Sequence, residues 1–152
     1  MNQQAIANVL TRARSAIGHG IDYKLGEGGV DPNAALPTSN HECDCSGFVA
    51  WALGTTRNPK PGREWYIQTD NIWHDAMGPQ SVFVRVEEPI PGDVIVYPKI
   101  GSPDGYGHTG IWAGPGKFDV VDCCASKNGI YEHWQLAFAN AHTIYVRLRQ
   151  WS

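Results

Sequence analysis

The sequence predicts an α+β fold in which helices come first and an antiparallel sheet follows. Apolar residues recur at helical spacing near the start of the chain, whereas the second half holds short segments rich in β-branched and aromatic residues. Helices that precede the strands, rather than alternating with them, favour α+β over alternating α/β. With 152 residues, the chain is expected to form a single domain over residues 1–152 and to bury a core.

Three helices are expected. Apolar residues share one face of a helix over residues 3–17. A second, buried helix follows Asp44, a residue type that caps helix N-termini, and is expected to end at a Gly54 cap. Residues 18–44 between them are glycine-rich without periodicity, which predicts a long ordered loop of the kind that often carries function. A short helix is expected at residues 69–77.

Five short strands are expected in the second half of the chain. Pro-Gly, Ser-Pro-Asp-Gly and Gly-Pro-Gly turns separate several of them. Short strands joined in this way predict an antiparallel meander. The expected strands lie within residues 81–88, 92–98, 108–114, 118–124 and 143–151.

Charge and hydropathy exclude several classes of function. The formal net charge is −3 and no long basic run occurs, so we expect no nucleic-acid partner. No apolar stretch approaches the roughly 20 residues that cross a bilayer. The N-terminus has no cationic region ahead of its apolar positions, so it does not resemble a secretory signal. We therefore expect synthesis in the cytoplasm without a signal peptide.

Four cysteines lie in two close pairs, Cys43 with Cys45 and Cys123 with Cys124. They are too few for a disulfide scaffold. Structural zinc sites favour ligand pairs separated by about two to four residues, which Cys43, Cys123, Cys124 and His41 do not provide. We expect no metal and no cofactor. A disulfide from Cys43 to Cys123 or Cys124 stays open at this stage, because sequence does not reveal its geometry.

The segment "HECDCSGFVAW" places Cys45 at the start of the buried helix. Unpaired N–H groups and the positive end of the helix dipole stabilise a thiolate there. A nucleophile also needs a base, and His108 in "GYGHTGIWAG" begins a predicted strand beside a loop. Asp122 on the next predicted strand is the candidate that orients the imidazole, with His133 and Asn140 as alternatives.

Three motifs in order, "DCSGFVAWAL", "PGDVIVY" and "GHTGIWAG", followed by a short strand that ends in a polar residue, resemble those of the NlpC-type peptidoglycan peptidases. A fifth match, "GIDYKLGEGG", lies upstream of the nucleophile. The family consists of papain-like cysteine peptidases, and the resemblance spans residues 16–125. It implies a papain-like fold in which the nucleophile helix packs on an antiparallel sheet. Cys45 matches the nucleophile and His108 the base. Asp122 stands where the family usually has histidine, asparagine or glutamine.

The resemblance also assigns residues to the substrate. Tyr23 matches a tyrosine whose hydroxyl lies near the oxyanion, where the backbone N–H of Cys45 would be the other donor. Asp44 and Ser46 match positions that hold the free amino end of the substrate. The implied activity cuts the stem peptide between D-glutamate and the diamino acid through a thioester.

Other activities stay open. The same site could act as an N-acetylmuramoyl-L-alanine amidase or a transferase, or the chain could be a catalytically silent wall-binding module. The expected partner is peptidoglycan or a muropeptide. The absence of a signal peptide and of a separate wall-binding domain is consistent with a phage lysin, with an effector injected into rival cells and countered by an immunity protein, or with a recycling enzyme.

Overall fold

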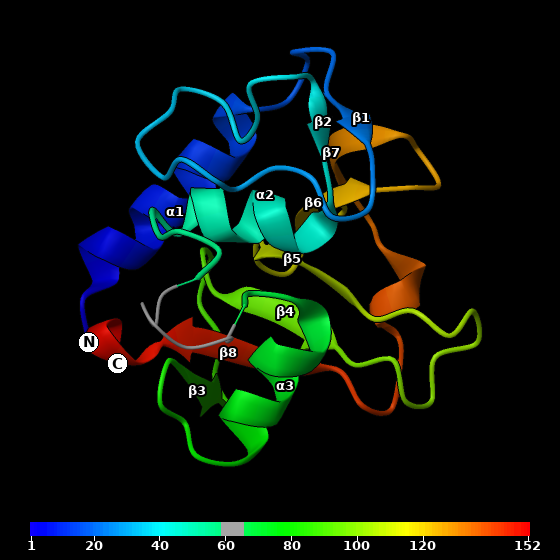
Figure 1. Cartoon of the computed structure of the whole chain (residues 1–152). Coiled ribbons are helices and arrows are strands. Elements are labelled where there is room, and N and C mark those ends of the chain that lie inside the picture. Colours follow the sequence, from blue (N-terminus) through cyan, green and yellow to red (C-terminus); the bar gives the residue numbers. More distant parts are fainter. Residues whose placement is uncertain (59–65) are drawn as a thin grey trace.

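The computed structural model describes residues 1–58 and 66–152. These residues form an antiparallel sheet with helices on one side of it (Figure 1). The α-helices of these residues are α1 (Gln3–Ser15), α2 (Cys45–Ala52) and α3 (Thr69–Met77). The strands are β1 (Asp22–Tyr23), β2 (Glu42–Cys43), β3 (Phe83–Val86), β4 (Val94–Tyr97), β5 (His108–Trp112), β6 (Val120–Cys124), β7 (Gly129–His133) and β8 (Ile144–Leu148). Two short 3-10 helices are η1 (Leu136–Phe138) and η2 (Arg149–Trp151).

The main sheet has the order β3-β8-β4-β5-β6-β7, and each neighbouring pair is antiparallel. The expected meander is confirmed for β4, β5 and β6. It is wrong for β3, because β8 lies between β3 and β4, with Val146 opposite both Arg85 and Val94. Turn residues report only on strands that follow one another in the chain, so they carry no signal for this insertion.

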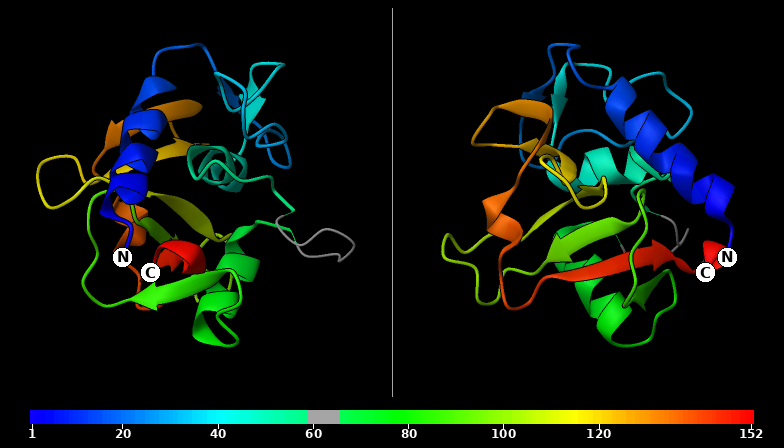
Figure 2. Two further views of the ribbon diagram at one scale, coloured as in Figure 1. Left: turned by 90° about the vertical axis from the view of Figure 1, so that its left-hand side faces the viewer. Right: turned by 180° about the vertical axis from the view of Figure 1, so that it is seen from behind.

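The helices cover one face of the sheet (Figure 2). α2 packs on β5 and β6, α1 packs on α2, and α3 packs on β3 and β4. Every residue of α2 is buried, as expected for a helix that is apolar on all sides. Among the described residues, no helix combines the length and apolarity that crossing a bilayer requires. The largest fully buried side chains of this core include Trp51, Phe48, Phe83, Ile72 and Ile111.

The helices agree with prediction except at their ends. α1 stops at Ser15 rather than residue 17. Asp44 caps α2 as expected, but the C-cap is Leu53, and Gly54 follows it with a φ of 69°. The long loop over residues 18–44 is confirmed, although it contains β1 and β2, a two-residue parallel pair that the sequence did not indicate.

β7 was not predicted from the sequence. Its sequence, GIYEH, begins with glycine and ends in two polar residues, so it lacks the alternating apolar pattern of a half-buried strand. It nevertheless pairs along the whole of β6, with His133 opposite Val120 and Tyr131 opposite Asp122. This pairing brings a second histidine to the predicted site.

A buried ion pair joins the start of β4 to β8. Arg147 donates from Nε to Asp93 Oδ1 and from Nη2 to Asp93 Oδ2, both at 2.7 Å, and Asp93 is 1% exposed. We expect Arg147→Met to lower the free energy of unfolding by about 3–5 kcal/mol, because it leaves a buried carboxylate without its cation. Urea denaturation would measure the loss.

The matched control is Glu87→Ala, which removes the partner of Arg85 in a surface pair. Such a change should cost less than about 1 kcal/mol. Equal losses in the two variants would contradict a structural role for the buried pair.

Candidate active site

The predicted nucleophile lies where the N-terminus of α2 meets β5 and β6. Cys45 is the first residue of α2 and is 6% exposed. Gly47 lies in the first turn, where the backbone of the preceding loop passes so closely that a Cβ would come 2.7 Å from the carbonyl oxygen of Glu27. The glycine of the Cys-Ser-Gly motif therefore allows the loop to pack against the helix N-terminus.

His108, the first residue of β5, joins the predicted nucleophile to an acid. Its Nε2 donates to Asp122 Oδ2 at 2.7 Å, and the charge of the nearby Cys45 thiolate also acts on the imidazole. Because Nε2 is engaged by Asp122, Nδ1 is the nitrogen left for the thiol. The ring lies near Tyr97 and Phe138, with centroids 6.4 and 5.2 Å away. The structure thus brings together the three residues that the sequence predicts as catalytic.

The protonation states of the pair follow from these contacts. Burial alone would lower the pKa of His108, but its hydrogen bonds with Asp122 and Cys45 raise it to about 10. Burial would likewise raise the pKa of Asp122, yet hydrogen bonds from His108 and His133 hold it well below its ordinary value. His108 is therefore an imidazolium at neutral pH, and its positive charge lies beside Cys45.

Asp122 has further partners, and one of them is an alternative named from the sequence. The carboxylate is fully buried, and its Oδ1 accepts from His133 Nε2 at 2.6 Å. Gln135, which the sequence analysis missed, donates from Nε2 to Asp122 Oδ2 at 3.2 Å. Asn140 instead accepts from the backbone N–H of His142. His133 thus joins Asp122 rather than replacing it.

A pocket of about 480 Å³ opens beside His108. Tyr23, Tyr97 and Tyr106 line it together with the carboxylate of Asp104. Burial raises the pKa of Tyr23, and the negative charges of Cys45 and Asp44 raise it further, so the phenol keeps its proton. A protonated hydroxyl is what a donor to an oxyanion requires. The other lining residues are Leu25, Gly107, Cys124, Ala125, Ser126, Gln135 and Ala137.

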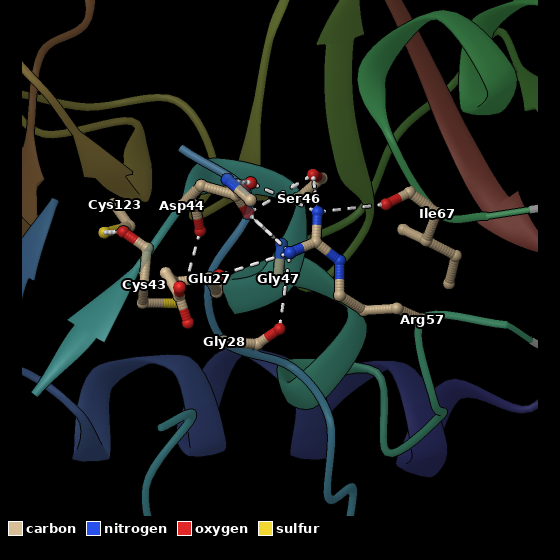
Figure 3. Close-up of polar contacts among 10 residues, drawn as sticks. Glu27, Gly28, Cys43, Asp44, Ser46, Gly47, Arg57, Ile67 and Cys123 are labelled. Carbon is tan, nitrogen blue, oxygen red and sulfur yellow. Dashed lines mark hydrogen bonds and ion pairs between the residues drawn. The ribbon is translucent and has the colours of Figure 1, made fainter. Parts of the chain in front are cut away.

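Asp44 and Ser46 are buried and engaged by Arg57, a residue that the sequence analysis did not single out (Figure 3). Arg57 contacts the Asp44 carboxylate from both Nη1 and Nη2, at 3.1 and 3.2 Å. Its Nη2 also donates to Ser46 Oγ at 2.8 Å. The pair predicted to hold the amino end of a substrate thus already holds a cation of the protein itself.

Backbone carbonyls complete the site of Arg57. The guanidinium donates to the carbonyl oxygens of Glu27 and Gly28 at 3.2 and 3.3 Å, and lies 4.4 Å from the centre of the Tyr66 ring. These partners come from distant parts of the sequence. An isolated arginine in a turn-rich segment gives no local signal, so the sequence could not reveal this role.

The four cysteines are free thiols, and neither disulfide considered from the sequence is formed. The Cys123 thiol donates to the carbonyl oxygen of Cys43, which lies beneath the start of α2. A hydrogen bond with Cys43 and burial both raise the pKa of Cys123, so it stays protonated. Cys123 is a packing residue in this structure.

The described residues bring together one group with the side chains to hold a metal, namely Asp122, Cys124 and His133, with ligand atoms within 4.8 Å of one another. This set differs from the cysteine set with His41 weighed from the sequence. Both oxygens of Asp122 already accept hydrogen bonds from histidines, so an ion here would compete with the contact that orients His108.

Similar solved structures identify the fold. No protein-family model and no curated protein matches the chain. NlpC1 from Trichomonas vaginalis aligns with a TM-score of 0.57 and 17% identity over 93% of this chain. A hypothetical invasion protein of Mycobacterium tuberculosis gives 0.55 and 19% over 97%, and the P60 domain of an antigen from M. avium subspecies paratuberculosis gives 0.54 and 18% over 95%.

The chain therefore has the papain-like NlpC-type fold that its motifs implied, with the nucleophile helix packed on an antiparallel sheet. It spans 44% of the Trichomonas chain, 64% of the M. tuberculosis chain and 95% of the P60 domain. At these identities the likeness is one of fold.

Proposed function

We propose that the protein is a cysteine peptidase that cuts the stem peptides of peptidoglycan. The observation that carries this proposal is the position of His108, which hydrogen-bonds the buried carboxylate of Asp122 and lies near Cys45 at a helix N-terminus. A thiol, an imidazole and an orienting group in this order form the constellation of nucleophilic acyl transfer. The NlpC-type fold and its ordered motifs support the choice of substrate.

The proposed reaction proceeds through a thioester. The Cys45 thiolate attacks the amide carbonyl, and the backbone N–H of Cys45 with the Tyr23 hydroxyl stabilises the oxyanion. The imidazolium of His108 gives its proton to the leaving amine as the C–N bond breaks. His108 then takes a proton from water, whose oxygen attacks the thioester, and returns a proton to the departing sulfur. Asp122 holds the imidazole in place during both steps.

The bond that we propose is cut joins D-glutamate to the diamino acid of the stem. Support for this choice comes from the NlpC-type motifs and from the pocket beside His108, whose tyrosines and Asp104 offer aromatic surface and a carboxylate to a polar peptide. The chemistry needs neither a metal nor an organic cofactor.

A digest of purified peptidoglycan tests the proposal. Wild-type protein should release products that end in L-alanyl-D-glutamate, identified by mass spectrometry, and Cys45→Ala should reduce their release to background because it removes the nucleophile. Cys123→Ala, which removes a buried thiol that packs against Cys43 and does not line the pocket, is the matched control and should keep activity.

Two outcomes would contradict the proposal in different ways. Release of intact stem peptides from the sugar would identify an amidase that uses the same Cys45 and His108. Binding of peptidoglycan without any product would identify a silent wall-binding module.

A further inference from the structure

The carboxylate beside the nucleophile has no capacity left for a substrate. Asp44 Oδ1 accepts from the backbone N–H of Gly47 at 2.7 Å and lies 3.1 Å from Arg57 Nη1. Asp44 Oδ2 accepts from the backbone N–H of Gly26 at 2.8 Å and from Arg57 Nη2 at 3.2 Å. A carboxylate offers about four acceptor positions, and all are filled in Asp44, which is 3% exposed.

Arg57 cannot easily leave this place. Its side chain is 5% exposed, and it binds the Ser46 hydroxyl and two backbone carbonyls as well as Asp44 (Figure 3). Moving the guanidinium would leave a buried carboxylate without its cation and several acceptors without donors, which is strongly unfavourable. A substrate cation would have to displace a partner that is already desolvated and bound on several sides.

Among the residues that the structure describes, the other anions near Cys45 do not replace Asp44. A free peptide amino end, with a pKa of about 8, is an ammonium at neutral pH and needs a buried anion if the site is to require it. Asp122 is committed to His108 and His133. Asp104 lines the pocket but is exposed, and an exposed ion pair changes affinity by no more than about fivefold.

We infer that Arg57 occupies the place beside the nucleophile where a substrate ammonium would bind, so that the site takes peptides whose amino end is acylated. In peptidoglycan, such a peptide is a stem still joined to its sugar. This inference rests on the proposed function, and it replaces the amine-binding role that the resemblance implies for Asp44 and Ser46. Those two residues instead hold Arg57, which binds the N-terminus of α2 to the loop around Gly28.

Two synthetic stem peptides that differ only at the amino end test the inference. One has a free L-alanine amine and the other an N-acetyl group, and kcat/KM is measured for each with wild-type protein. We expect the acetylated peptide to be cut at least as fast as the free one, or within about fivefold of it, since Asp104, the carboxylate that the described residues bring to the pocket, is exposed and can favour the ammonium only weakly.

The possible failures are distinguishable. A free peptide cut more than fiftyfold faster than the acetylated one would overturn the inference and leave the proposed function standing. Cleavage of neither peptide, by a preparation whose circular dichroism shows that it is folded, would overturn both.

Substitution of Arg57 supplies an independent readout. In Arg57→Gln the Asp44 carboxylate loses its cation, so the preference for the free amine should rise by about tenfold or more. Arg57→Lys keeps the charge and should preserve the wild-type ratio. The same preference can be measured as the ratio of the two peptides' dissociation constants, using protein that also carries Cys45→Ala and therefore does not cut them. An unchanged ratio in folded Arg57→Gln would contradict the inference, and if neither variant folds, the wild-type comparison decides.

Discussion

Asp122→Ala is expected to lower kcat by roughly 10³- to 10⁴-fold, the size of loss seen when the orienting carboxylate of Ser-His-Asp enzymes is disabled. The alanine removes the acceptor that holds Nε2 of His108 at 2.7 Å and the charge that stabilises the imidazolium. KM should change little, because Asp122 is fully buried and does not line the pocket. Steady-state kinetics on a stem peptide would measure both constants.

Asp122→Asn is the matched variant. Its single amide oxygen can accept from only one of the two histidines that the carboxylate serves, so activity should lie between those of wild type and Asp122→Ala. Both variants should also lose stability, since each disturbs a buried network, and rates must therefore be corrected for the folded fraction. Full activity in both would place the orienting role elsewhere.

His108→Ala is expected to slow the alkylation of Cys45 by iodoacetamide about 10- to 30-fold at pH 7, because it removes the positive charge that lies beside the sulfur and activates it as a nucleophile. In the wild type, the pKa of His108 is raised to about 10, so its positive charge persists across the neutral range and is lost only above it. The difference in labelling rate between wild type and His108→Ala should accordingly persist across the neutral range and shrink only above it. Mass spectrometry of labelled peptides would follow each cysteine separately.

The other cysteines serve as internal controls. Cys43 and Cys123 are 0% exposed and should label only when the protein unfolds. A Cys45→Ser variant should lack the fast phase altogether. If all four thiols reacted at one rate, Cys45 would have no activation from His108.

The fold and the three central residues were predictable because their signals are local. Cys45 is recognisable from an N-cap aspartate before an apolar helix, and His108 from a glycine-flanked strand start. Asp122 follows from its place on the next strand. Each of these inferences depends on a few consecutive residues whose spacing sets the direction of the side chain.

The remaining features depend on contacts between distant segments. His133 and Gln135 were not assigned to Asp122 because β7 lacks an alternating pattern, and Arg57 reaches Asp44 across 13 residues of turn-rich chain. The hydrogen bonds and ion pair between Arg57 and Asp44 are the basis of our inference that Asp44 does not bind a substrate amine, the role that its motif implies. A motif shows which residue types are present. Only the folded structure shows which other side chains of the same protein already bind them.

The position of β8 between β3 and β4 has a consequence for biosynthesis (Figure 1). A ribosome delivers α2, β5, β6 and β7 before it delivers β8, so the residues around Cys45 are all present while β3 and β4 still have bare edges facing each other. Unpaired strand edges invite association with other chains. A nascent chain that stalls before Ile144 should therefore need a chaperone, and its sheet becomes continuous only when Val146 arrives to pair with both neighbours.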